Sequence, residues 1–114
     1  MGQPVVHFEI AAKDAKKLQD FYARVFDWDI DANNEWNYGV VTTGGEGGIN
    51  GGIGQAVNYQ GVMFYVQVDD PQAYLDKVTS LGGQTMMPPS EIPGIGTLAL
   101  FRDPEGNLTG LFKR

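Results

Sequence analysis

Residues 5–30, VVHFEIAAKDAKKLQDFYARVFDWDI, carry the clearest secondary-structure signals of the chain. Its first six residues are mostly apolar, β-branched or aromatic, which predicts a strand over residues 5–10. Asp14 is a good helix N-cap, and the apolar side chains after it recur at helical spacing, which predicts an amphipathic helix over residues 14–26. The next apolar stretch predicts a second strand over residues 28–32. The chain therefore begins with a strand, a helix and another strand.

The rest of the first half predicts two more strands. The turn signal Asn33-Asn34 precedes a predicted strand over residues 36–42. Residues 44–54 hold seven of the sixteen glycines. We expect residues 44–48 to form a loop and residues 49–53 a short strand. The segment has neither the lysine nor the spacing of a phosphate-binding loop, so we expect its glycines to open space in a cleft.

The same order then starts again. VMFYVQV, residues 62–68, predicts a strand, and Asp70-Pro71 supplies an N-cap followed by proline at the first helical position. Gly82-Gly83 ends the second helix. Three further strands are expected: one from residue 84 that breaks at Pro88-Pro89, one over 97–102, and one over 108–113 after the turn 103–107. Two similar units, about 1–57 and 58–114, therefore make up one domain.

Composition and charge exclude several classes of protein. The chain has 114 residues and no cysteine, which excludes disulfides, thiolate metal sites and cysteine nucleophiles. Its net charge of -6 argues against nucleic-acid binding. No apolar run approaches the roughly 20 residues that span a bilayer, and the first residues do not resemble a signal peptide. We therefore expect no membrane partner and a cytoplasmic location.

The predicted strands place a mixed set of side chains on one face. Because side chains alternate along a strand, Phe8 and Ile10 should pack under the first helix, while His7 and Glu9 face the other way. The matching strand places Phe64, Val66 and Val68 under the second helix, and the following side chains on the mixed face: Met63, Tyr65 and Gln67. Such a face is typical of a small-molecule pocket, although it could equally be solvated or covered by a partner chain.

Other residues complete the predicted ligand site. Trp28, Trp36, Tyr38 and Tyr59 could stack on an aromatic ligand, although Trp28 could equally pack in the core. Asn50 lies in the glycine-rich segment, and Met87 precedes the two prolines. His7 could transfer protons, with Glu9 orienting it or stabilising its charge, and this pair gives the predicted catalytic residues. The alternative is a purely structural pair in which each side chain satisfies the other.

Three segments resemble a known family. They are residues 5–30, the segment GGINGGIG at 47–54, and IPGIGTLALFRDPEGNLTGLF at 92–112 with its DPEGN turn. Together they resemble the vicinal oxygen chelate superfamily, which includes glyoxalase I, bleomycin-resistance proteins and extradiol dioxygenases. The subgroup they most resemble is the glyoxalase-like proteins described as related to lactoylglutathione lyase. The resemblance implies an α+β fold in which two βαβββ modules form a concave, partly closed mixed sheet with the helices outside.

The metal site of that superfamily is only partly present. The resemblance places its first ligand at His7, which matches, but the equivalent position in the second module is Met63, a poor ligand for a hard divalent ion. The glutamate after the last turn falls on Gly110, and the remaining position falls near Asn50 or Gly51. We therefore expect no cofactor. A divalent metal at His7 and Glu9, completed by a symmetric dimer, is the alternative.

Three functions are compatible with these observations. The first is binding of a small organic molecule without the full metal site. The second is an enzyme of lyase, isomerase or dioxygenase type that uses His7 and Glu9, with or without a metal. The third is an interaction module whose mixed face is a dimer surface. A homodimer is expected under all three.

Overall fold

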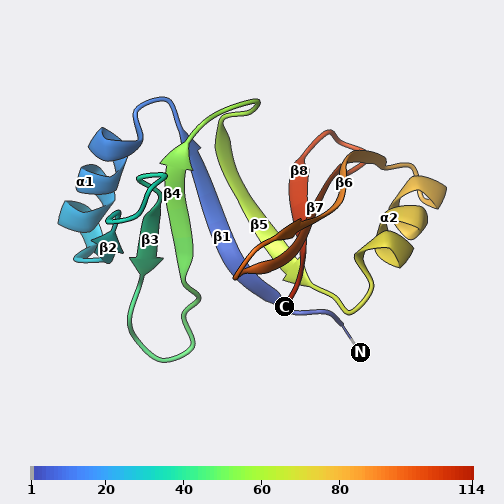
Figure 1. Ribbon diagram of the computed structural model, residues 1–114, viewed down its shortest axis with the longest axis horizontal. Coiled ribbons are helices and arrows are strands. Elements are labelled where there is room, and N and C mark those ends of the chain that lie inside the picture. The colour runs from blue at the N-terminus through green and yellow to red at the C-terminus, as the bar shows by residue number, and fades with distance from the viewer. Residues whose placement is uncertain (1) are drawn as a thin grey trace. The chain divides into compact units, whose positions relative to one another are not determined.

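The computed structural model describes residues 2–114 and has an α+β fold built from two βαβββ modules (Figure 1). Contacts group the chain into two compact units, His7–Met63 and residues 2–6 with Phe64–Arg114. The predicted order of elements is confirmed in both halves. Among residues 2–114, no helix has the length and apolar character needed to cross a membrane.

The first module contains four strands and one helix: β1 (Val5–Ala12), α1 (Ala15–Phe26), β2 (Asp29–Asp31), β3 (Gly39–Thr42) and β4 (Gly51–Gln55). The strands lie in the order β2-β3-β4-β1. β2 with β3 and β3 with β4 are antiparallel, whereas β1 and β4 are parallel. The parallel pair puts residues of β1 directly beside the glycine-rich strand.

Helix α1 begins and ends where its capping residues predict. Asp14 adopts an extended backbone, and its Oδ1 accepts a hydrogen bond from the amide of Lys17 at 3.2 Å. Asp27 ends the helix in the left-handed conformation. Between these caps the helix contributes Ala15 to a core whose other buried side chains are Ile10, Ala12, Val41 and Ile53. Burying a side chain such as Ile53 stabilises the fold by about 1.5–3 kcal/mol.

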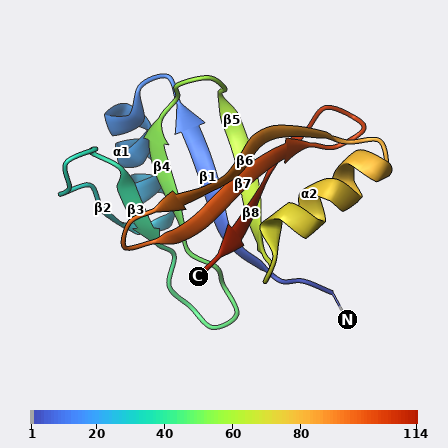
Figure 2. The ribbon, with the colours of Figure 1, turned by 45° about the vertical axis from the view of Figure 1, so that its right-hand side comes forward.

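The second module repeats the order: β5 (Gly61–Gln67), α2 (Pro71–Ser80), β6 (Gln84–Ile92), β7 (Gly96–Arg102) and β8 (Leu108–Lys113). Its strands lie in the order β5-β8-β7-β6, with β5 and β8 parallel and the other pairs antiparallel. Helix α2 lies beside β6–β8 (Figure 2). It covers a second core, whose buried members are Val68, Leu75, Ala99 and Leu111.

Four local expectations were wrong. The strand predicted from residue 36 begins only at Gly39, because Asn34 Oδ1 accepts hydrogen bonds from the amides of Trp36 and Tyr38 and forms a turn. The strand expected at residues 49–53 lies at Gly51–Gln55 instead. β6 is not broken at Pro88-Pro89, since these prolines lie at an edge and an irregularity of the ladder, where a missing N–H is tolerated.

The fourth difference concerns Phe64. The alternating pattern places it under the second helix, but its side chain is 45% exposed, and the core of this module begins with Val66 and Val68. The side chains on either side of it, Met63 and Tyr65, are buried. The simple alternation of apolar residues therefore misassigns the first part of this strand.

Candidate functional site

Strand β1 separates two sets of side chains, as its sequence predicts. Ile10 and Ala12 are buried in the core beneath α1, with Phe8 packed against that core. His7 and Glu9 have the opposite parity and are half-buried. The half-exposed pair keeps two polar groups within the reach of a ligand.

Tyr38 joins this pair from the turn before β3. The turn is held by Asn34, whose Nδ2 donates to the carbonyl of Tyr38 at 2.8 Å and whose Oδ1 accepts from its amide at 3.0 Å. The Tyr38 side chain then lies against Gly52 and Gly54 of β4, and a Cβ at Gly52 would collide with its hydroxyl end. Because Glu9 pairs with Gly52 in the ladder, these glycines let the tyrosine approach Glu9.

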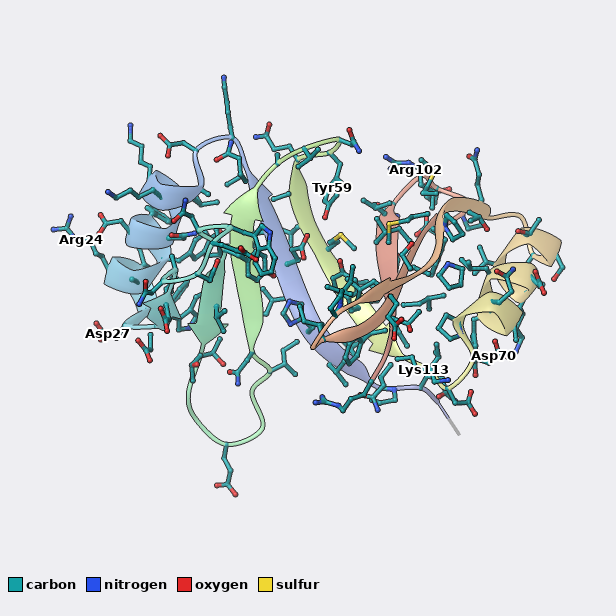
Figure 3. The ribbon with its side chains drawn as sticks, in the orientation of Figure 1. Arg24, Asp27, Tyr59, Asp70, Arg102 and Lys113 are labelled. Atoms are coloured by element: carbon teal, nitrogen blue, oxygen red, sulfur yellow. The ribbon has the colours of Figure 1, made fainter. Side chains whose placement is uncertain are left out.

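A chain of hydrogen bonds links four side chains of the unit His7–Met63. His7 Nε2 lies 3.2 Å from Tyr38 Oη, and Tyr38 Oη donates to Glu9 Oε1 at 3.4 Å. Tyr59 Oη donates to the other carboxylate oxygen, Glu9 Oε2, at 2.5 Å. Tyr59 lies in the connection between β4 and β5 (Figure 3). We call these four residues, His7, Glu9, Tyr38 and Tyr59, the polar array.

The environment of His7 favours its neutral form. Burial lowers the pKa of His7 below its ordinary value of 6.5, and the negative charge of Glu9 opposes this effect without cancelling it. The imidazole is therefore neutral at physiological pH, with one nitrogen that donates and one that accepts. The polar array thus combines a neutral base, two hydroxyls and a carboxylate. These are the groups needed to bind a polar ligand group or to move a proton.

The second module has different side chains at the positions equivalent to those of His7 and Glu9. Tyr65 of β5 pairs with Gly110 of β8, just as Glu9 pairs with Gly52. A Cβ at Gly110 would collide with the Tyr65 ring, so that ring occupies the space beside the glycine. Met63 and Tyr65 are buried, and Gln67 is half-buried.

The remaining residues of the predicted ligand site lie in loops, turns and strands where other contacts are recorded for them. Asn50 Oδ1 accepts from the amide of Thr43 at 3.0 Å and so closes the loop between β3 and β4. Trp36 lies in the turn before β3 and is 70% exposed, and Met87 is half-buried on β6. The backbone amide of Gln67 donates to the carbonyl of Pro4. Of Trp36, Tyr38, Asn50 and Met87, it is Tyr38 that the hydrogen bonds described next place in the polar array.

Tyr59 is the member of the array whose hydrogen bond to Glu9 the sequence does not predict, since the sequence suggests it only as a ring that could stack on a ligand. Residue alternation within a strand identifies neighbours such as His7 and Glu9, but it cannot show which loop residue reaches them. The only sequence signal is a tyrosine in a short polar connection just after the glycine-rich strand. That signal identifies an aromatic residue without identifying its partner.

A groove of about 440 Å³ lies between the end of β1 and α1. Its lining includes the apolar side chains of Ile10, Leu18 and Phe21 and the basic residues Lys13 and Lys17. None of the four array residues lines it. The groove is therefore a second place where a ligand could bind, and it provides a control for experiments on the array.

The side chains at the expected metal positions do not fit the superfamily's metal ion. His7 supplies an imidazole, but Met63 offers only a thioether and Gly110 no side chain, and the space beside Gly110 holds the Tyr65 ring. The strand register puts the fourth position at Gly52 and not near Asn50 or Gly51 as expected, and the space beside Gly52 holds the Tyr38 side chain. Within residues 2–114 no three His, Asp or Glu side chains gather as a metal site would require.

Comparison with known proteins agrees with this architecture. A crystal structure of a glyoxalase/bleomycin resistance protein/dioxygenase superfamily member from Vibrio splendidus superimposes with a TM-score of 0.68 at 17% identity, covering 99% of this chain and 100% of that one. Methylmalonyl-CoA epimerase from Mycobacterium tuberculosis gives a TM-score of 0.63 at 15% identity, covering 96% and 86%. Both share the fold.

Sequence comparison identifies the family. The protein named "Putative glyoxylase CFP32" from Mycobacterium tuberculosis is 30% identical over 118 residues, which cover 92% of this chain. This chain spans only 43% of the length of that relative. The model of one protein family matches residues 5–111, nearly the whole sequence. The chain belongs to the Glyoxalase/Bleomycin resistance protein/Dioxygenase superfamily.

Proposed function

We propose that this protein binds a small organic molecule at the polar array and does so without the superfamily's metal ion. One observation carries the proposal: Glu9 is held by two tyrosine hydroxyls beside a neutral, half-buried imidazole. Partial burial of a charge costs free energy unless the charge is well hydrogen-bonded. A carboxylate with a purely structural role would therefore destabilise the fold less at the surface.

The charges of the site indicate the class of ligand. Glu9 is a carboxylate, His7 is neutral at pH 7, and the whole chain carries a net charge of -6. An anionic ligand would meet repulsion from both the site and the protein as a whole. A neutral or cationic molecule that carries hydroxyl or N–H groups would instead donate to Glu9 and exchange hydrogen bonds with the tyrosines. We therefore propose a neutral or cationic ligand with such donors.

A thermal-shift screen tests this proposal. The panel would contain matched neutral, cationic and anionic compounds, including phenols, alcohols and amines. We expect neutral or cationic donors to raise the melting temperature of the wild-type protein, and Glu9→Gln to abolish that effect. Glu35→Gln, the same change at an exposed turn residue, is the matched control and should retain it. Stabilisation that survives Glu9→Gln, or no stabilisation by any compound, would overturn the proposal.

A proton-transfer enzyme is the second candidate. The observation that favours it is the neutral His7 connected through Tyr38 to a carboxylate, because a base that is unprotonated at pH 7 can remove a proton from a weak carbon acid. Lyase, isomerase and epimerase reactions share such a step. The structural similarity to methylmalonyl-CoA epimerase supports testing this class, although the negative charge of the site disfavours anionic thioesters.

Isotope exchange distinguishes the second candidate from the first. Small ketones and uncharged thioesters would be incubated in D₂O with the protein, and loss of the α-proton signal would be followed by NMR. A proton-transfer enzyme should accelerate exchange, and His7→Gln should reduce the rate by about 100-fold or more. If a compound binds at the array without exchange, simple binding is the function. Equal exchange with wild type and His7→Gln would eliminate the enzymatic candidate.

Independence from metal is tested by titration of the purified protein with Zn²⁺, Mn²⁺ and Ni²⁺. We expect no change in melting temperature that depends on His7. A metal-dependent increase that disappears in His7→Gln would instead support the metal-dependent alternative, including lyase or dioxygenase chemistry. The protein without a polyhistidine tag is required, because a tag would bind the same ions.

We further propose that the chain forms a homodimer. Helix α1 exposes three large apolar side chains, Phe21, Val25 and Phe26, each more than half accessible. Grouped apolar side chains of this kind are unusual on the surface of a monomer. Analytical ultracentrifugation should give the mass of two chains, and Phe21→Asp should shift the sedimentation toward that of one chain. A wild-type monomer at high concentration would contradict this proposal.

A further inference from the structure

The groove between the end of β1 and α1 has the size of a ligand pocket. Its volume of about 440 Å³ lies within the range of small-molecule pockets, roughly 300–1,000 Å³. All of its lining residues belong to the compact unit His7–Met63, and none of them is a member of the polar array. Binding in this groove therefore does not depend on the proposed function of the array.

The apolar part of the lining comes from α1 and from the end of β1. Leu18 and Phe21 are three residues apart and so share one face of the helix. Phe21 is 55% exposed, whereas Ile10 and Ala12 of β1 are buried. The lining also includes Gly61, where an added Cβ would meet nothing within 4 Å. An apolar ligand in this open space would cover exposed ring surface of Phe21, and the removal of that surface from water favours binding.

The backbone at the start of α1 is already hydrogen-bonded within the chain. The carbonyl of Lys13 accepts from Gln55 Nε2 at 2.5 Å. The amide of Lys17 donates to Asp14 Oδ1 at 3.2 Å, and the amide of Leu18 donates to the Asp14 carbonyl at 3.1 Å. These backbone groups are therefore engaged, and the charged part of a ligand must be recognised by side chains.

Two lysines supply the charge of the groove. Lys13 lies in the connection between β1 and α1, Lys17 lies in the first turn of α1, and both are exposed. Within residues 2–114 the structure records no ion pair for either ammonium group. Asp14, the helix N-cap, is the one carboxylate among the lining residues. Two lysines and one aspartate give this groove a net charge of +1 on a chain whose net charge is -6.

We propose that this groove is a second ligand site, which binds a small organic anion. The apolar body of the ligand lies against Leu18 and Phe21, and its carboxylate lies beside Lys13 and Lys17. The long apolar stems of the lysines extend the apolar surface while their ammonium groups meet the carboxylate. The preference is opposite to that of the polar array, where the charge of Glu9 disfavours anions.

Three compounds with the same apolar body and different head groups test the proposal: 4-phenylbutyrate, 4-phenylbutan-1-ol and 4-phenylbutylamine. Each is titrated into ¹⁵N-labelled protein at about pH 7, where the acid and the amine are both charged. We expect saturable shifts of the amides of Lys13, Leu18 and Phe21. The acid should bind about 10-fold more tightly than the alcohol, as two exposed ion pairs allow, and the amine more weakly than either. Absence of these shifts with the acid, or equal affinity for the three compounds, would overturn the proposal.

The double variant Lys13→Gln/Lys17→Gln tests the origin of the preference. It removes both ammonium groups, so the preference for the acid over the alcohol should fall to about 2-fold or less. Lys16→Gln, at an exposed lysine of the same helix that does not line the groove, is the matched control and should retain the preference. Because the readout is a ratio of two affinities in one variant, a general loss of stability does not produce it. A preference that survives in the double variant would overturn the proposal.

A pair of phenylalanine variants tests the apolar part of the site. Phe21→Ala should weaken binding of the acid and the alcohol alike by about 5-fold. Phe26→Ala truncates another exposed phenylalanine of the surface proposed for the homodimer but does not line the groove, so it should leave both affinities unchanged. Equal losses in the two variants would overturn the assignment to the groove. A second copy that fills the groove would exclude all three compounds, and that outcome would overturn the proposal as well.

Discussion

The two modules place a glycine at the same position of the fourth strand but use the space differently. In the first, Gly52 pairs with Glu9 and gives room to Tyr38, which arrives from another part of the chain. In the second, Gly110 pairs with Tyr65 and gives room to the ring of that same tyrosine. Gly52 leaves room for the Tyr38 hydroxyl to reach the Glu9 carboxylate, whereas Gly110 leaves room for the ring of Tyr65.

Two modules with the same strand pairing therefore place different functional groups beside the same glycine. Both modules keep a parallel strand pair and a helix that covers an apolar core. Only the first supplies a histidine, a carboxylate and hydroxyls to one face of its strand. Stability is therefore expected to depend on both modules, and ligand recognition mainly on the first.

The largest expected effect tests whether the modules are equal in packing. Ile53 and Leu75 are almost completely buried, one in each core. We expect Ile53→Ala and Leu75→Ala each to lower the free energy of unfolding by about 3 kcal/mol in urea denaturation, because both leave cavities. Leu81→Ala, at a 72% exposed site, should cost well below 1 kcal/mol. A large difference between the losses of unfolding free energy in Ile53→Ala and Leu75→Ala would show that the two cores do not contribute equally to stability.

The next effect concerns the space beside Gly52. An added methyl group would collide with the hydroxyl end of Tyr38, so Gly52→Ala should destabilise the protein by about 2 kcal/mol. Gly54→Ala meets the ring only at 2.8 Å and should cost less. A double-mutant cycle with Tyr38→Ala is the control. In the Tyr38→Ala background, Gly52→Ala should lower the unfolding free energy much less. Additive costs in that cycle would show that Tyr38 does not need the glycine.

A smaller effect comes from the hydrogen bond of Tyr59. Tyr59→Phe removes the donor to Glu9 Oε2 and should lower the unfolding free energy by about 1–2 kcal/mol, as expected for a bond to a charged group. In Glu9→Gln the same substitution should cost less, since a neutral acceptor makes a weaker bond. Equal costs in the two backgrounds would mean that Tyr59 acts through packing and not through the carboxylate.

The smallest effect is a pH dependence that belongs to His7. Burial lowers the pKa of His7 in the folded protein, so the unfolded chain binds a proton more readily. Stability contributed by neutral His7 is thus present above the unfolded pKa of 6.5 and is lost as the pH falls through the lower folded pKa. His7→Gln should lose less stability than wild type between about pH 7.5 and 5.5. Parallel profiles would contradict the lowered pKa.

The sequence predicts most of the fold because its strongest signals are local. The N-caps Asp14 and Asp70 both accept the hydrogen bonds expected of them. The turn at 103–107 forms as its composition predicts, with Asp103 accepting from the amides of Glu105 and Asn107. The wrong expectations at Phe64 and at Pro88-Pro89 depend on which neighbours cover a strand, and no local pattern contains that information.

The candidate site is predictable only in part, for the same reason. Alternation along one strand puts His7 and Glu9 on one face, and in the structure both side chains contact the hydroxyl of Tyr38, a link that alternation does not predict. The glycines of β4 were expected to open space, but it is Tyr38 that fills the space beside Gly52. Whether the predicted ligand residues contact a ligand stays a prediction, and the hydrogen bond from Tyr59 to Glu9 required the structure to be found.

An NMR titration with a bound compound shows whether the polar array is the ligand site. A stabilising compound from the screen would be titrated into ¹⁵N-labelled protein while the His7 ring signals and the backbone amides are followed. We predict saturable shifts of the His7 ring signals, together with the amides of Glu9, Tyr38 and Tyr59. Saturable shifts confined to the groove beside α1, at Leu18 and Phe21, with His7 unchanged, would contradict it.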